Sequence, residues 1–277
     1  MQARDLVAAD APTKDFGRLL RHWRLVRRYS QLDLAGEASV SSRHLCFLEN
    51  GRAHPSRDMV QALGSALDLP LEVQNALHLA AGFVPPFGDQ GWAAVDLQHV
   101  RHALDFILNQ QEPFPAIVLD GRWDVRIRNE SSRRIFGIFH KGYDMEKDLA
   151  NNAMHVVFHP KGLRQFIVNW TDFAGHLVQL LHREVAQGSR SAAKLRDEIL
   201  VYPGVPAGWK VPQSPPSSSP VMTMQLCKDD LRLDFFSMLT TFAMPHEVAL
   251  QQLKIECFYP ANTATAAKVR ELAASTS

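Results

Sequence analysis

The sequence predicts an α+β protein of two domains: an all-α domain of five helices, followed by a domain of antiparallel sheet and helices. Three observations support this prediction. The 277 residues, 46% of them hydrophobic, are enough for two cores. Residues 15–81 space their apolar side chains by three and four, which is typical of helices. After residue 220, short apolar stretches separated by turn residues are typical of strands.

Positive charge is concentrated near the N-terminus. Residues 14–57 carry nine Lys/Arg against four Asp/Glu, a net charge of +5, whereas the whole chain carries only +1. A solvated basic helix face produces the same pattern, so the charge by itself does not identify a partner. Together with the helix pattern described next, it favours binding to DNA phosphates.

Residues 30–51 have the pattern of two short helices that cross over a tight turn. A single helix would keep one apolar face throughout, but here the register breaks at Ser39–Val40 and restarts at Leu45. Ser41 can cap the second helix. Ser39 occupies a turn position that favours glycine, whereas Gly36 lies inside a helix, where it costs about 1 kcal/mol relative to alanine.

The second of these helices presents side chains that suit base edges in a major groove. Arg43 is the candidate for a bidentate contact to guanine, and Ser42 can contact either base edge. His44 can contact a base or a phosphate. Phe47 can touch a thymine methyl group or pack against the preceding helix, and the sequence leaves both interpretations open. Candidate phosphate contacts are Gln31, Asn50, Arg52, Arg27 and Arg28.

The first half resembles the XRE (Cro/repressor-like) family of helix-turn-helix domains. The matching features are Gln31, the L-E-N-G of residues 48–51, and Pro55-Ser56, where Ser56 can cap the next helix. Ser39, in place of the usual glycine, is a departure. The resemblance implies a DNA-binding domain over residues 14–82, after a tail at 1–13. One copy reads one half-site, so we expect a homodimer on a double-stranded operator.

The second domain is predicted over residues 97–265, after a linker at 83–96 and before a C-terminal tail at 266–277. A hairpin is expected at 116–128 with Asp120-Gly121 in its turn, and Asn129 can cap the following helix. Further helices are expected near 97–109, 145–154, 162–186 and 191–200. Residues 203–220 hold six prolines, which predicts a long loop. Strands are expected at 221–226, 231–242 and 253–259.

This half resembles the ligand-binding domain of MmyB-like transcription regulators. The resemblance is carried by RWDVRIRNESSRRIFG, FHPKGLRQFIVNWTDFAGHLV, YPGVP and LDFFSMLTTFAMPHEVALQQLKIECFYPA. It implies a PAS-like fold that binds a fatty-acid-like molecule. The candidate ligand contacts are Asn129, Phe136, Phe139, Met154, Phe158, Trp170, Phe173, Phe236 and Phe242, with His159 and Asn169 as further polar anchors.

Two interpretations of the aromatic-rich second half remain open. Its large side chains can line an apolar cavity for an effector, or they can fill an ordinary core. In the second case the domain would only dimerise or dock a protein partner. We expect a transcription regulator that is not an enzyme and has no cofactor, because no G-x-S-x-G or glycine-rich phosphate loop occurs.

No metal site is predicted, and the chain is expected in the cytoplasm. His155 and His159 are four residues apart but lack the glutamate of H-E-x-x-H, and Pro160 interrupts the helix. Cys46, Cys227 and Cys257 form no CxxC pair, which favours a reducing compartment. The sequence contains neither a signal-peptide pattern nor an apolar run long enough to cross a membrane.

Overall fold

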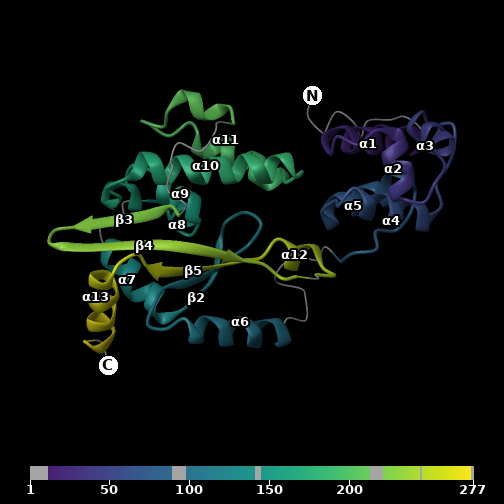
Figure 1. The fold of residues 1–277 in the computed structure, drawn as a ribbon. Helices are drawn as coiled ribbons and strands as arrows, with labels where there is room; N and C mark the ends of the chain where they lie inside the picture. The colour runs from purple at the N-terminus through teal and green to yellow at the C-terminus, as the bar shows by residue number, and fades with distance from the viewer. Residues whose placement is uncertain (1–11, 89–97, 141–144, 213–220, 244, 276–277) are drawn as a thin grey trace. The chain divides into compact units, whose positions relative to one another are not determined.

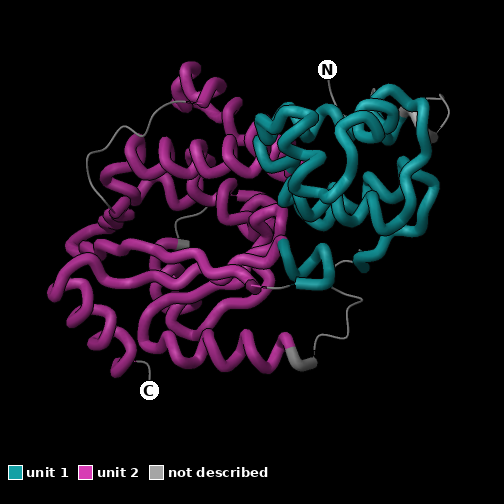
Figure 2. The backbone as a smooth tube through the Cα atoms, turned by 45° about the vertical axis from the view of Figure 1, so that its right-hand side comes forward, with its two compact units in different colours: residues 1–91, 186–188, 244–251 teal, residues 92–185, 189–243, 252–277 magenta. Residues whose placement is uncertain are grey.

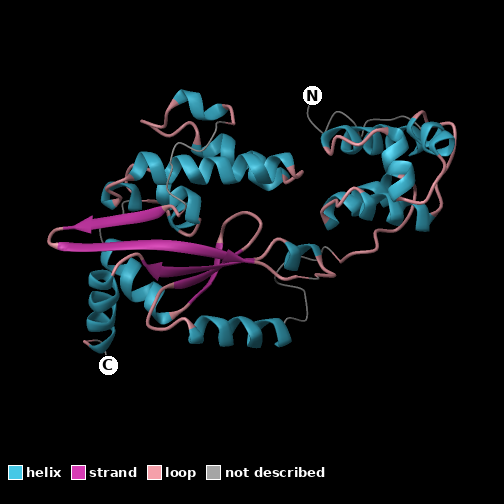
Figure 3. Cartoon of the chain, viewed as in Figure 1, coloured by secondary structure: helices cyan, strands magenta, loops and turns pink. Residues whose placement is uncertain are grey.

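The structure is a computed structural model that describes residues 12–88, 98–140, 145–212, 221–243 and 245–275. By its contacts the chain divides into two compact units, coloured separately in Figure 2. The first comprises residues 1–91, 186–188 and 244–251, and the second comprises the remainder. The predicted α+β class is confirmed (Figure 3).

The first unit contains the five predicted helices (Figure 1). They are α1 (Pro12–Val26), α2 (Gln31–Glu37), α3 (Ser42–Glu49), α4 (Arg57–Ala66) and α5 (Leu71–Ala80). Fully buried Phe16, Leu20, Leu34, Leu45 and Leu63 form its core. Part of the predicted linker lies on α5, where Asn75 Nδ2 donates to Phe87 O at 2.9 Å. A short helix from much later in the chain, α12 (Val248–Gln251), belongs to this unit, and Gln251 Oε1 accepts from Leu71 N–H at 2.8 Å.

The crossing of α2 and α3 has the local features predicted from sequence. Ser39 adopts a φ of 55°, as the turn requires, and Ala35 and Ala38 are buried where the helices meet. Ser41 Oγ accepts from His44 N–H at 3.2 Å and caps α3. The helices α1 and α3 also lie so close together that a Cβ on Gly17 would clash with the carbonyl oxygens of Leu48 and Glu49.

The second unit is built on a five-stranded antiparallel sheet in the order β2-β1-β5-β4-β3. The strands are β1 (Ala116–Leu119), β2 (Val125–Arg128), β3 (Thr223–Lys228), β4 (Leu231–Thr240) and β5 (Lys254–Pro260). One face carries Ile117, Leu119, Leu233, Phe235 and Phe258, which join the buried core. That core also includes residues of α9 (Ala153–Phe158) and α10 (Trp170–Ala186), which lie on one side of the sheet in Figure 1, while α6 (Gln98–Gln110) lies on the other.

Several helices differ from the sequence expectation. The stretch expected as one helix at 162–186 is a 3-10 helix, η2 (Leu163–Phe166), followed by α10. That expected at 145–154 is divided into α8 (Lys147–Ala150) and α9, because Asn152 accepts from the N–H groups of Met154 and His155 and starts a new helix. The remaining helices are α7 (Glu130–His140), α11 (Arg190–Ile199), η3 (Ala207–Lys210) and α13 (Thr263–Ala274).

The helix α13 covers much of the stretch expected as a C-terminal tail. Asn262 Oδ1 accepts from Thr265 N–H at 2.8 Å and caps it, and Val269 is fully buried. Most of the expected N-terminal tail, the second half of the linker and part of the proline-rich loop lie outside the described residues. Within the described ranges, no helix combines the length and apolarity needed to cross a membrane.

Candidate functional sites

The helix α3 exposes a compact set of polar side chains. Ser42 and Arg43 are exposed in its first turn, and Asn50 is exposed at its end. The Arg43 guanidinium carbon lies 5.5 Å from the centroid of the half-buried Phe47 ring, a cation–π geometry that holds the arginine over the aromatic face. Arg43 is therefore pre-oriented on the outer surface of the helix.

The other residues predicted to contact DNA belong to α3 or to the segments before and after it. His44 is half-buried, and Arg52 and Arg28 are exposed. Asn50 Nδ2 donates to Cys46 O at 2.8 Å, so its amide is partly engaged within α3. Arg27 Nη2 donates to Asp68 O at 2.7 Å, which ties this side chain to the end of α4.

An ion pair beneath α3 was not anticipated from the sequence. Arg24, one of the nine basic residues within 14–57, is buried and donates to Glu49 from Nε at 2.5 Å and from Nη2 at 3.0 Å. The hydrogen bond to Glu49 raises the pKa of Arg24. Gln31 Nε2 also donates to Glu49, at 2.7 Å, so one carboxylate joins α1, α2 and α3. The sequence did contain a signal for this burial, because Arg24 lies at helical spacing and has an apolar neighbour on each side.

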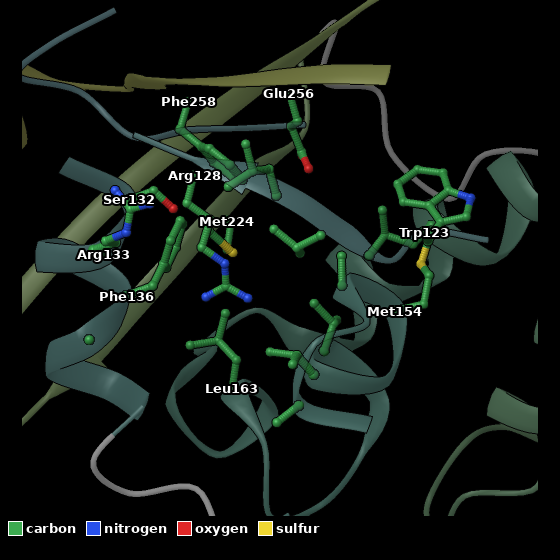
Figure 4. A pocket seen from close by; sticks show the side chains of 18 of the residues that line it. Trp123, Arg128, Ser132, Arg133, Phe136, Met154, Leu163, Met224, Glu256 and Phe258 are labelled. Carbon is green, nitrogen blue, oxygen red and sulfur yellow. The ribbon is translucent and has the colours of Figure 1, made fainter. Parts of the chain in front are cut away.

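The second unit contains a cavity of about 280 Å³ between the sheet and the helices that cover it (Figure 4). Its lining is mainly apolar and includes Ile117, Val125, Phe136, Met154, Phe173 and Phe258. The polar residues in the lining are Arg128, Ser132, Arg133 and Glu256. Ligand cavities in proteins have this composition: an apolar wall with a few polar groups.

Two of these polar groups are buried. Ser132 is fully buried, and its Oγ has no hydrogen-bond partner among the described residues. Glu256 is 9% exposed, and burial raises the pKa of its carboxyl from 4.5 to about 7, against a hydrogen bond from Ser237 that lowers it. Buried polar groups without full hydrogen bonding are costly, so their presence here points to a ligand or water in the cavity.

A β-bulge explains how Arg128 reaches the cavity. Val118 pairs with Ile127, but Leu119 pairs with Val125, so β2 carries an extra residue at this point. The bulge turns both Val125 and Arg128 to the face that carries the cavity, although they are three residues apart. Simple alternation puts Val125 and Ile127 inward and the arginines outward, which is why the sequence pattern missed Arg128.

The residues predicted to bind a ligand fall into two groups. Phe136, Met154 and Phe173 line the cavity. Phe139 and Phe158 are fully buried elsewhere in the same core, and the Trp170 indole N–H donates to Val157 O at 2.9 Å. Phe236 stacks on Tyr259 with ring centroids 5.4 Å apart, and Phe242 follows the end of β4. These last five are not among the lining residues.

The three predicted polar anchors form contacts within the protein. Asn129 Oδ1 accepts from the N–H groups of Ala116 and Ser132, which joins β1 to the start of α7 as predicted for a capping residue. Asn169 Nδ2 donates to Thr223 O at 2.8 Å. His159 packs edge-on against the Tyr202 ring.

His155 does not form a metal site with His159. Its Nδ1 lies 2.7 Å from the Tyr202 hydroxyl, and its Nε2 lies 3.4 Å from Glu198 Oε2. Burial lowers the pKa of His155, and the nearby Glu198 opposes the shift. No cluster of three or more His, Cys, Asp and Glu suited to a metal occurs in the described parts of the chain.

Comparisons with known proteins agree with this geometry. Residues 100–272 match the family model described as the MmyB-like transcription regulator ligand binding domain, and residues 15–77 match that of a helix-turn-helix domain. No curated protein matches the chain.

Several solved structures are similar to this chain. The restriction-modification controller protein C.AhdI from Aeromonas hydrophila is 27% identical, with 23% of this chain and 94% of that chain covered and a TM-score of 0.22. The clp gene regulator ClgR from Corynebacterium glutamicum is 23% identical, with 27% and 92% covered and a TM-score of 0.24. An RNA-binding light-oxygen-voltage receptor is 10% identical, with 99% and 66% covered and a TM-score of 0.30.

Proposed function

We propose that this chain, which belongs to the MmyB-like transcription regulators and is a DNA-binding helix-turn-helix regulator, is controlled by a small apolar acid. The observation that carries the proposal is the mainly apolar cavity with Arg128 and the buried Ser132 hydroxyl in its lining. The chain would act in the cytoplasm as a homodimer without enzymatic activity. Its effector would change the affinity of the dimer for its operator.

The DNA half of the proposal rests on α3. Arg43 is exposed and held over Phe47, and arginine bonded to guanine is the commonest specific contact in the major groove. Exposed Arg28 and Arg52 would supply positive charge for contacts to phosphates. A single copy of the motif gives one half-site, so a dimer would read two.

The test of Arg43 begins with selection of an operator from random duplex DNA by the full-length protein. We expect Arg43→Ala to weaken binding by about 1–3 kcal/mol per half-site and to relax the preference at one base position. Arg232→Ala, at an exposed arginine on β4, is the matched control. An unchanged ratio of affinities for selected and scrambled DNA would remove Arg43 from this role.

The effector half rests on the chemistry of the cavity. An apolar wall favours a hydrocarbon body, and a guanidinium is well suited to a carboxylate because it donates two parallel hydrogen bonds. Ser132 would supply a further hydroxyl donor. Fatty-acid-like molecules combine these two features, an apolar chain and one carboxylate.

Isothermal titration with a series of saturated acids tests this half. We expect Arg128→Leu to weaken binding of the best acid about tenfold or more, since hydrogen bonds to charged groups contribute about 1.5–3 kcal/mol. Binding of the matching alcohol should change little. Arg126→Leu, two residues away and bonded to Asp120, is the control. Equal loss of acid and alcohol would contradict the role of Arg128.

Regulation requires that the acid change DNA affinity. Coupling between two sites typically amounts to about 1–3 kcal/mol, so the operator affinity should change about five- to 150-fold when the cavity is saturated. Fluorescence anisotropy with labelled operator measures it, and Arg128→Leu should lose the effect at the same acid concentration. Operator binding that is indifferent to every bound acid would overturn this mechanism.

The alternative is that the second unit only dimerises or docks a protein partner. Exposed Met238 on β4 favours it, because 56% of the surface of this apolar side chain is accessible. Under this alternative, native mass spectrometry of the purified protein finds no small molecule, and acids cause no thermal shift. Substitution of Met238 by serine would then weaken dimer formation or partner binding.

A further inference from the structure

We propose that Glu256 is a specificity-determining residue whose carboxyl donates a hydrogen bond to an oxygen on the body of the effector. The cavity would then select an acid that carries a second oxygen function, such as an oxo or hydroxy group, over a plain hydrocarbon acid. This inference rests on the proposed function, because it assumes that an acid occupies the cavity with its carboxylate at Arg128.

Glu256 lies where a buried sheet residue is normally apolar. It belongs to β5, the central strand, and pairs with Ile117 on β1 and Leu239 on β4. Figure 4 shows its carboxyl pointing from the sheet into the cavity. Two residues along the same face of β5, Phe258 also lines the cavity. A carboxyl group therefore interrupts an otherwise apolar part of the wall.

The carboxyl is suited to act as a donor. Burial is the main cause that raises its pKa to about 7, so below neutral pH it carries a proton that can be donated. Ser237 bonds to it but does not cancel the effect of burial. A buried acid kept neutral by an apolar site can donate a hydrogen bond to a ligand oxygen in the same way as a buried hydroxyl.

The charged groups near this carboxyl come from several elements. Arg128 on β2 and Arg133 on α7 line the same cavity, and Arg133 Nη1 lies 3.5 Å from Glu130 Oε2. Lys254 lies two residues before Glu256 on β5, and its Nζ is 3.2 Å from Glu184 Oε1 on α10. The neighbouring Cys257 thiol has a pKa raised by burial and by Glu256. The α9, η2 and α10 residues in the lining are apolar.

The two anchors are separated by one strand. Arg128 pairs with Ile117, and Ile117 pairs with Glu256, so their Cα atoms are two strand spacings, about 10 Å, apart. The volume of the cavity is about 280 Å³. A medium-chain acid with its second oxygen some carbons from the carboxylate matches both the cavity volume and the separation of the two anchors.

The experiment is isothermal titration of the full-length protein with decanoic acid and with its oxo and hydroxy derivatives, varied in oxygen position. At pH 6 we expect the best oxodecanoic acid to bind about tenfold more tightly than decanoic acid. That preference should disappear at pH 8, because the ionised Glu256 can no longer donate. A hydroxydecanoic acid should keep more of its preference at pH 8, since a hydroxyl can donate to the carboxylate.

Two substitutions separate hydrogen bonding from burial. Glu256→Gln keeps a donor that does not titrate, so the oxo preference should persist at both pH values. Glu256→Leu removes the donor, and the preference should be lost while decanoic acid still binds. Glu271→Gln, at an exposed glutamate bonded to Lys268 on α13, should behave as the wild type.

The outcomes distinguish the two proposals. If plain and oxygenated acids bind equally in the wild type and in both Glu256 variants, this inference fails and the acid-sensing function stands. If no acid binds to the wild type at either pH, the proposed function fails and this inference fails with it. An oxo preference that persists in Glu256→Leu would also overturn the role of Glu256.

Discussion

Glu49 in the first unit and Glu256 in the second are both buried, but they differ in the groups that surround their carboxyls. Glu49 accepts three hydrogen bonds, two from Arg24 and one from Gln31. Glu256 lies beside an apolar cavity, and its pKa rises to about 7. The first carboxylate is fixed by a guanidinium and joins three helices, whereas the second can gain or lose its proton near neutral pH. Glu49 is therefore a structural acid, whereas the surroundings of Glu256 suit contact with a ligand.

The largest expected effect is on the structural acid. Glu49→Ala leaves Arg24 buried without its partner, and removal of one member of a buried ion pair costs about 3–5 kcal/mol. Urea unfolding followed by circular dichroism measures the change in the free energy of unfolding. Glu37→Ala, at an exposed glutamate on α2, is the control and should change it little. A loss below about 1 kcal/mol would show that the pair contributes no more than a surface contact.

The second prediction concerns the stability of the sheet unit as a function of pH. The pKa of Glu256 is higher in the folded protein, about 7, than its ordinary value of 4.5. Folding therefore becomes less favourable as the pH rises through this window, and the penalty is complete above it. Glu256→Gln should leave stability nearly unchanged at pH 4 and raise it at pH 8 by as much as about 3 kcal/mol.

Urea unfolding of the wild type and Glu256→Gln at both pH values tests the sign. Glu271→Gln, which changes an exposed glutamate, should give the same small effect at each pH. A stabilisation by Glu256→Gln that is equal at pH 4 and pH 8 would mean that Glu256 does not titrate between them. The contrast with Glu49 would then lose its basis.

The two units also differ in how far the sequence predicts them. In the first, the signals are local: Ser30, Ser41 and Ser56 each accept an N–H at the start of a helix within three residues. Such short-range contacts can be read directly from residue spacing. The pairing of Arg24 with Glu49 spans 25 residues, and no local pattern contains it.

In the second unit, the strands were predictable but the cavity was not. Arg128 faces the cavity only because a bulge shifts the pairing of β1 with β2. Glu256 faces it because of the register of β5 between β1 and β4, two contacts that join distant parts of the chain. Aromatic residues such as Phe139 and Phe158 have the same sequence signature as Phe136, yet they lie away from the cavity.

The smallest predicted effects test whether local backbone preferences limit the first unit. Ser39 has a φ of 55°, which glycine adopts at lower cost, and a Cβ on Gly36 would meet open space. Ser39→Gly and Gly36→Ala should each raise the free energy of unfolding by about 0.5–1 kcal/mol. Gly17→Ala is the contrasting variant, since its Cβ would clash with the Leu48 and Glu49 carbonyl oxygens and should destabilise. The contradicting result would be that Gly36→Ala destabilises the protein as Gly17→Ala does. In that case α2 would have to lie against another surface at position 36, and local helix propensity would not explain the stability of this unit.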